Sequence, residues 1–516
     1  MRRTLPSLLL VLLLAPSASA DATGTFTLGG PERDHGWNVA TDGQGNLFVV
    51  GSFKGTIDFD PGPEVTEHTA GDDGTPVSRT RGRMDAFVVK YDVEGKLDWL
   101  LVLGGSGVNL ARSIAVDELG GVAVAGQFSG HVDFDPSDPM DEADSLDAGQ
   151  GRNAYVARYD ADGTFLWVVG IGDDDRAPPG SRELDVEWSE GIRDVEIGPD
   201  GNVYVAGMFR GTIDLDPGDE TAMRTSHEGS RDAFLACYDA DGRYLWDAVV
   251  GGEGGDQGHA VAIGPGGRVA LGGVFEGIVD FDRGPDELLA AGAGGWDVFV
   301  AAYEDGGKVA SVWTWGGRGA DQLGSSALAF DAGGALYAAG TFSGNIDFDP
   351  GRKRVMREAD GRGDAFVVRY DADGKLDWAL TFGGKGDDRA LALTRDRSGH
   401  VIVGGRFSDE VDFDPSGRKR ILESAGEAGA TDAFVASYDV KGKIRWARSI
   451  GGEISGPRHI SYTTGLARGH GDEIVAVGTY FGSPELGSGR KAFTLPNAGS
   501  SDVFVVRFDG KGKVVP

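Results

Sequence analysis

Asp85-Ala-Phe-Val-Val-Lys-Tyr-Asp92 is a short stretch that recurs along the whole chain. Its small, aromatic and β-branched residues between two polar ends are typical of a strand buried in a sheet. The other six copies begin, at intervals of roughly seventy residues, with Asn153, Asp232, Asp297, Asp364, Asp432 and Asp502. Self-similarity at a fixed period indicates a repeat architecture, so the stretch is one element of a repeated unit.

Each unit contains four stretches with strand character. In the second copy they are Ser113–Asp117, Val122–Phe128, Ala154–Tyr159 and Phe165–Val169, separated by Gly-rich or Asp-rich turns. Alternating residues between such turns predict antiparallel hairpins. Four-stranded units repeated radially build a β-propeller. The sequence therefore predicts an all-β fold, a seven-bladed β-propeller with four antiparallel strands per blade.

The two ends of the chain predict how the ring closes. The last copy stops at Gly512-Lys-Val-Val-Pro516, where the other copies continue into a fourth strand. The segment Gly24-Thr-Phe-Thr-Leu28-Gly-Gly30 matches the fourth strand Trp99-Leu-Leu-Val-Leu103-Gly-Gly105 position by position. We expect the N-terminal strand to complete the C-terminal blade, because two strand edges would otherwise stay unpaired.

Residues 1–20 read as a signal peptide. Arg2 and Arg3 precede the apolar run Leu8–Leu14, and Ala18-Ser19-Ala20 is a small-residue cleavage site. Residues 21–516 would then form a single propeller domain in an exported protein of the periplasm, the cell surface or the medium. No later stretch is apolar for long enough to predict a membrane span.

The composition narrows the classes of partner. With 49 basic and 81 acidic residues the formal net charge is −32, which repels nucleic acid and anionic membranes. The single cysteine, Cys237, excludes an intramolecular disulfide and any multi-cysteine metal site. The sequence therefore predicts no nucleic-acid partner.

A glycine recurs in the second strand of every unit, two residues before an aromatic side chain. A glycine in a strand permits close approach of a neighbour or a β-bulge. The aromatic residues that follow, and a recurring fourth-strand tryptophan, should pack between blades. The glycines are Gly51, Gly126, Gly207, Gly273, Gly340, Gly405 and Gly478, and the tryptophans are Trp99, Trp167, Trp246, Trp378 and Trp446.

The repeat resembles the bacterial seven-bladed β-propeller repeat family, often called SBBP repeats. The resemblance rests on Gly-Asn-Val-Tyr-Val-Ala-Gly at 201–207, on the Gly-Gly loops and on an Asp-Phe-Asp-Pro-Gly element. It implies an exported propeller and says little about activity. Ala365–Trp378 is also similar to the tryptophan-docking pattern of quinoprotein-like propellers, which we interpret as shared blade architecture.

The Asp-x-Asp-Pro-Gly element carries the candidate metal ligands. Two carboxylates one residue apart point the same way on an extended segment and, with turn carbonyls and water, could hold Ca²⁺. The alternative is structural, because Asp-Pro-Gly is good turn chemistry and the aspartates would cap the turn. The residues are Asp58, Asp60, Asp133, Asp135, Asp214, Asp216, Asp280, Asp282, Asp347, Asp349, Asp412 and Asp414.

A second polar ring follows the Gly-Gly pairs, four residues past the second glycine. It should lie on the same face of the propeller, near the central channel, where it could bind cations or a polyhydroxylated ligand. The alternative is that these side chains cap the loops between blades. The ring consists of Asp34, Asn109, Asp256, Asp321 and Asp388.

The sequence lacks the common hydrolase, zinc-protease and phosphate-loop motifs, so no catalytic residues can be named. It favours an exported, non-catalytic binding or scaffold propeller that takes a protein or polysaccharide at one face. Ca²⁺ is the one cofactor that the sequence suggests. The alternative is a glycan-active enzyme, a glycosidase or polysaccharide lyase, that uses carboxylates of the acidic face. The oligomeric state stays open.

Overall fold

The computed structural model describes residues 24–71, 84–105, 107–138, 144–149, 151–172, 191–216, 218, 221–282, 287–349, 353–425, 429–451, 460–486 and 493–515. The predicted signal peptide, residues 1–20, lies outside these ranges. The described residues form an all-β propeller with two short 3₁₀ turns, His227–Gly229 and Pro265–Gly267. No helix in the described parts of the chain has the length and apolar character needed to span a bilayer.

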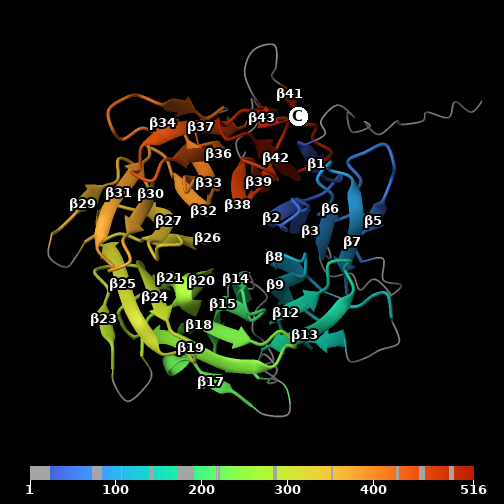
Figure 1. Cartoon of the computed structure of the whole chain (residues 1–516), viewed down its shortest axis with the longest axis horizontal. Coiled ribbons are helices and arrows are strands. Elements are labelled where there is room, and N and C mark those ends of the chain that lie inside the picture. Colours follow the sequence, from blue (N-terminus) through green and yellow to red (C-terminus); the bar gives the residue numbers. More distant parts are fainter. Residues whose placement is uncertain are drawn as a thin grey trace, which may run out of the picture.

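Antiparallel groups of strands follow one another around a central axis, and the first strand of each group lies nearest that axis (Figure 1). The first strands are β2 (Asp34–Thr41), β8 (Leu110–Val116), β14 (Gly191–Ile197), β20 (Gln257–Ile263), β26 (Gln322–Phe330), β32 (Arg389–Arg395) and β38 (Tyr462–Arg468). The second strands are β3 (Leu47–Phe53), β9 (Val122–Phe128), β15 (Val203–Arg210), β21 (Val269–Phe275), β27 (Leu336–Phe342), β33 (Val401–Ser408) and β39 (Ile474–Tyr480).

The repeated octad forms the third strand of each group and the tryptophan stretch forms the fourth. The third strands are β6 (Asp85–Tyr91), β12 (Asn153–Tyr159), β18 (Arg231–Tyr238), β24 (Asp297–Tyr303), β30 (Asp364–Tyr370), β36 (Thr431–Tyr438) and β42 (Asp502–Phe508). The fourth strands are β7 (Leu97–Leu103), β13 (Phe165–Ile171), β19 (Tyr244–Gly252), β25 (Val309–Gly317), β31 (Leu376–Phe382) and β37 (Ile444–Ile450).

Both ends of the chain close the ring. Strand β1 (Phe26–Leu28) pairs with β42, as the sequence predicts, and Leu28 lies opposite Val503. The short β43 (Val514–Val515) pairs with the same edge of β42 next to it, and the Thr25 hydroxyl donates to the Val515 carbonyl at 2.9 Å. The outermost strand of the closing sheet is therefore built from two pieces, one from each terminus (Figure 1).

A small hairpin lies between the second and third strands of each group, at the outer rim. The hairpins are β4–β5 (Thr56–Asp58, Glu67–Thr69), β10–β11 (His131–Asp133, Ser145–Asp147), β16–β17 (Thr212–Asp214, Met223–Thr225), β22–β23 (Ile278–Asp280, Leu289–Ala291), β28–β29 (Asn345–Asp347, Met356–Glu358), β34–β35 (Glu410–Asp412, Ile421–Glu423) and β40–β41 (Glu485–Leu486, Phe493–Thr494).

These hairpins reach back to the preceding group. Strand β22 pairs with β19 and β28 pairs with β25, while Val132 and Asp214 form single bridges to Gly105 and Gly172. Each contact covers the exposed edge of a fourth strand, which protects that edge from other chains. Neighbouring groups are thus joined by backbone hydrogen bonds as well as by side-chain packing.

The predicted arrangement of seven blades with four strands each is wrong as a description of the sheets. Two groups stay as separate four-stranded sheets and the closing group has five strands, whereas hydrogen bonds extend or join the remaining groups into two sheets of six strands and one of eight. Two physical causes account for this: the hairpins extend the fourth strands of neighbouring groups, and a bridge between Ser326 and Ala392 links β26 to β32. The hairpin strands, of two or three residues, are too short for the alternation that predicts a strand, and the bridge has no sequence pattern of its own.

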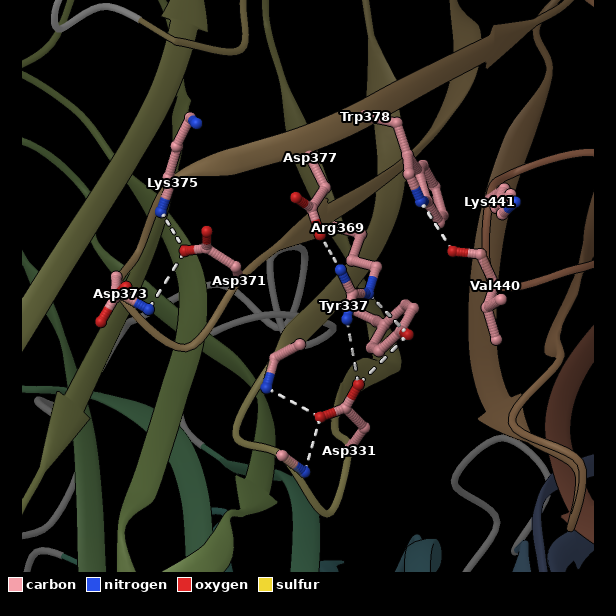
Figure 2. Close-up of polar contacts among 12 residues, drawn as sticks. Asp331, Tyr337, Arg369, Asp371, Asp373, Lys375, Asp377, Trp378, Val440 and Lys441 are labelled. Carbon is pink, nitrogen blue, oxygen red and sulfur yellow. Dashed lines mark hydrogen bonds and ion pairs between the residues drawn. The ribbon is translucent and has the colours of Figure 1, made fainter.

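The fourth-strand tryptophans pack between groups, as the sequence predicts. Figure 2 shows Trp378, whose Nε1 donates to the Val440 carbonyl of the next group at 3.2 Å. A Cβ atom on Gly442 of that turn would meet the Trp378 ring, so the turn requires glycine there. In the same region the Arg369 guanidinium donates to the Tyr337 hydroxyl at 2.8 Å. The docking segment is therefore structural.

Candidate functional site

Every innermost strand carries a β-bulge at the same height. The residue before each bulge pairs with one of the recurring second-strand glycines, for example Ala111 with Gly126. A Cβ on that glycine would collide with the Leu110 carbonyl, so the bulge needs glycine opposite it. The bulged residues are Trp37, Arg112, Arg193, His259, Gly324–Ala327, Leu391 and Thr464.

The bulges turn side chains toward the central axis, where they line a cavity of about 640 Å³. Each of the bulges contributes to its wall, together with the first residues of several inner strands. Five arginines line the cavity: Arg112, Arg193, Arg231, Arg389 and Arg406. A chain with net charge −32 thus brings five arginines together at one central pocket.

An aromatic stack holds the first of these arginines. The Arg112 guanidinium lies 3.9 Å from the centre of the Trp37 ring, a cation–π contact. Trp37 is held in turn by a hydrogen bond from its Nε1 to Ser52 Oγ at 3.0 Å and by stacking on His35. The Tyr462 hydroxyl lies 3.3 Å from His35 Nδ1. The position of the Arg112 guanidinium is therefore fixed by its neighbours.

A carboxylate holds two further arginines. Asp387 accepts a hydrogen bond from Arg389 Nε at 3.0 Å and one from Arg406 Nη2 at 2.7 Å. Arg389 Nη1 donates to the Gln322 side chain at 3.2 Å. One carboxylate balances only one of the two positive charges, so this side of the pocket keeps an excess of positive charge.

Two arginines lie near each other on the opposite wall. Arg193 is the bulged residue of β14, and Arg231 begins β18 in the same group. Burial, and then the charge of Arg231, lowers the pKa of Arg193 to about 10, so the Arg193 guanidinium is still protonated at neutral pH. Beside them, burial lowers the pKa of His259 to about 4, which makes its imidazole neutral at pH 7.

A polar network closes the inner end of the pocket. Asn38 Nδ2 donates to Ser113 Oγ at 3.0 Å and to Ser326 Oγ at 3.2 Å, and Ser113 donates to Asp194 at 2.7 Å. Asp194 also accepts the backbone N–H of Val261 at 3.0 Å, and burial raises its pKa to about 7. These residues come from β2, β8, β14, β20 and β26 (Figure 1). Because Ser326 also lines the cavity, the network forms its floor.

The Asp-x-Asp elements lie far from this pocket, in the rim hairpins. Asp412 Oδ1 accepts the backbone N–H groups of Asp414 and Arg420 at 3.0 and 2.8 Å, and Asp414 Oδ1 accepts that of Ser416 at 3.0 Å. The other copies repeat bonds of this kind through Asp58, Asp60, Asp133, Asp135, Asp214, Asp216, Asp280 and Asp347.

These bonds are those of turn-capping carboxylates. The residue between the two aspartates is buried, and in five copies a tyrosine from the third strand donates to its carbonyl, as Tyr438 does to Phe413 at 3.2 Å. Within the described ranges, no three His, Cys, Asp or Glu side chains gather as a metal site would require. Calcium binding by the hairpins stays a prediction to be measured.

The second polar ring lies at the mouth of the inner strands but is buried beneath the surface. Asp34, Asn109, Asp256, Asp321 and Asp388 are each 0 to 1% exposed. The aspartates accept backbone N–H groups from both neighbouring loops; Asp388, for instance, accepts those of Gly384 and Ser408 at 2.7 and 2.9 Å. The geometry therefore favours loop capping over direct ligand contact for these side chains.

The arginine pocket was missed by reasoning from the repeats, because its residues differ from copy to copy. The second-strand glycine that recurs opposite each bulge is the sequence signal that could have located the pocket residues. One further signal is length: Asp321 to Leu336 spans two residues more than Asp256 to Val269. The extra residues lie in the excursion Gly324–Ala327 of β26, which reaches the pocket floor.

No family model matches the chain. Over 448 residues it is 22% identical to the uncharacterized WD repeat-containing protein L264 of Acanthamoeba polyphaga mimivirus, covering 78% of this chain and 31% of that protein. Over 460 residues it is 24% identical to the regulatory protein FlaEY of Caulobacter vibrioides, covering 85% of this chain and 43% of that protein. The chain spans less than half the length of either relative.

Solved structures similar to this chain include WD40 propellers. The WD40 domain of Neurospora crassa Pan2 has a TM-score of 0.41 and 10% identity, covering 94% of this chain and 96% of that one. Sqt1 from Chaetomium thermophilum has a TM-score of 0.38 and 13% identity, covering 89% and 97%. The likeness concerns fold only, and the chain belongs with β-propellers through its own strands and their order.

Proposed function

We propose that this chain is a binding propeller whose central pocket takes an anionic ligand. The observation that carries the proposal is the gathering of five arginines on a cavity of about 640 Å³, in a chain that is otherwise strongly acidic. Arginine presents a planar fork of donors that matches carboxylate and phosphate oxygens in pairs. A partly buried set of such forks suits an anion that enters from solvent.

The contacts of the pocket support binding rather than chemistry. Arg112 is fixed by Trp37, and Arg389 and Arg406 are fixed by Asp387, so the donors are pre-organised. Pre-organised donors lower the entropy lost on binding. The carboxylates considered for a glycan-active enzyme, Asp256 and Asp321 among them, are buried and already accept backbone N–H groups.

The proposed setting is outside the cytoplasm. It rests on the charged, apolar and small-residue segments of residues 1–20 and on the resemblance of the repeats to exported bacterial propellers. Mass spectrometry of the protein from its native host should find a chain that begins at Asp21. A chain that retains residues 1–20 would contradict export by cleavage.

Thermal unfolding in the presence of citrate tests the anion pocket. A ligand that binds only the native state raises its stability, by about 2.7 kcal/mol at a concentration one hundred times Kd. We expect low-millimolar citrate to raise Tm at fixed ionic strength, and sucrose at the same concentration, too low for its general stabilising effect, to leave Tm unchanged. The double variant Arg231→Gln/Arg389→Gln should lose the shift, whereas Arg418→Gln on an exposed rim hairpin should keep it. An equal citrate shift in the double variant would overturn the proposal.

A further inference from the structure

Four of the five pocket arginines form two clusters on opposite walls, and the fifth, Arg112, is the one stacked on Trp37. Arg193 and Arg231 belong to the group of β14 and β18, whereas Arg389 and Arg406 belong to β32 and β33. Strands β14 and β32 lie on opposite sides of the central axis (Figure 1). A ligand with a single small anionic group would reach only one of these two clusters.

The wall between the clusters carries neutral hydrogen-bonding groups. Going around the ring from β14 to β32, the lining side chains are Gln257, His259, Trp296, Gln322 and Ser325. Glutamine amides and serine hydroxyls can both donate and accept. The neutral imidazole of His259 donates from Nδ1 to the Leu323 carbonyl at 2.9 Å, which leaves its Nε2 as an acceptor. This combination matches sugar hydroxyls, which also donate and accept.

The same wall also offers apolar surface. Trp296 lies half-buried on it, just before β24, and Leu323 is buried beside it. An indole ring in this position can pack against the C–H face of a sugar ring while the polar groups bind its hydroxyls.

We infer that the pocket binds an acidic saccharide with at least two carboxylates, one held by Arg193 and Arg231 and the other by Arg389 and Arg406. This inference rests on the proposed function and names its ligand class. The floor formed by Asn38, Ser113, Asp194 and Ser326 closes the inner end, so the saccharide enters from the mouth. The pocket would therefore take a short oligosaccharide or a chain end.

Isothermal titration with tetragalacturonate tests the inference on the chain from residue 21. The matched probes are galacturonate, which has one carboxylate, and the neutral galactose tetramer, which has none. We expect tetragalacturonate to bind at least tenfold more tightly than galacturonate, and the neutral tetramer to show no binding. Arg231→Gln and Arg389→Gln, one from each cluster, should each weaken tetragalacturonate binding at least tenfold, whereas Arg418→Gln should not change it.

Other results would overturn the inference in distinguishable ways. Equal affinity for the neutral tetramer, or no effect of either pocket variant, would show that the arginines do not recognise the carboxylates. Binding of phosphate or tetraglutamate, sensitive to Arg231→Gln and without any tetragalacturonate binding, would leave the anion pocket standing and refute the saccharide. Absence of binding by all these anions, to a folded protein, would refute both.

Discussion

Single glycines decide where functional side chains point in this propeller. Gly207 pairs with Ile192 just before the bulge, and its missing Cβ leaves room for the Gly191 carbonyl. The bulge then turns Arg193 toward the axis instead of into the packing between sheets. The glycine was predictable from the repeat, and the pocket residue opposite it was not, because its identity changes in every copy.

At the residue scale, Asp256 offers a test of the buried polar ring. Its two oxygens accept the backbone N–H groups of Gly252 and Glu276 at 2.9 and 3.1 Å. An amide has one accepting oxygen and an NH₂ group that would face the other N–H. We therefore expect Asp256→Asn to lower the free energy of unfolding by about 1–3 kcal/mol in urea titrations.

The size of that loss should depend on pH. Burial raises the pKa of Asp256 to about 7, above its value in an unfolded chain, so the folded state binds the proton more tightly. This contribution is fully present below about pH 4 and is lost as pH rises toward 7. The difference between the wild type and Asp256→Asn should be larger at pH 5.5 than at pH 8, and a gap that widens with pH would contradict it.

At the scale of elements, variants of the rim hairpins distinguish turn capping from calcium binding. Asp412 caps its hairpin through one oxygen that accepts two N–H groups, at 3.0 and 2.8 Å. Asparagine keeps such an oxygen but loses the charge, whereas alanine loses both. Turn capping therefore predicts a loss of about 1–3 kcal/mol in Asp412→Ala and less in Asp412→Asn.

Thermal unfolding in EDTA and in millimolar Ca²⁺ completes this comparison. If the aspartates act as caps, the Tm of each of the three proteins should be the same in EDTA as in Ca²⁺, although the variants have a lower Tm than the wild type. A calcium-dependent rise in the wild type that Asp412→Asn reduces would instead mean that the native state binds the ion. That outcome would make the carboxylates metal ligands.

The rim hairpins were only partly predictable from the sequence. Their strands are two or three residues long, too short for an alternating pattern, and two of the hairpins, β22–β23 and β28–β29, pair with a fourth strand of the preceding group. The Asp-x-Asp turn itself was visible, with its capping role as one of two alternatives. Its partner, the edge of β19 or β25, depends on how neighbouring groups are placed in space.

At the scale of the whole molecule, repetition made the propeller predictable, and departures from repetition made the pocket unpredictable. The recurring octads and turns predict strands that the structure contains. The pocket instead depends on arginines from β8, β14, β18, β32 and β33, whose convergence follows only from closure of the ring. Comparison of the repeats finds residues that recur, so it cannot find a pocket whose lining residues differ from repeat to repeat.

Closure of the ring is itself open to measurement. Leu28 of β1 is buried against the closing sheet, and β1 covers the edge of β42 at Val503–Val505. A chain that begins at residue 31 lacks β1, whereas one that begins at residue 24 keeps it. Losing the buried Leu28 side chain alone should cost about 2–5 kcal/mol, and the uncovered edge of β42 can pair with another chain. We expect a lower Tm by calorimetry and higher oligomers by size-exclusion chromatography for the shorter chain. An unchanged Tm with a monomeric profile would mean that packing between neighbouring sheets holds the ring closed without this strand.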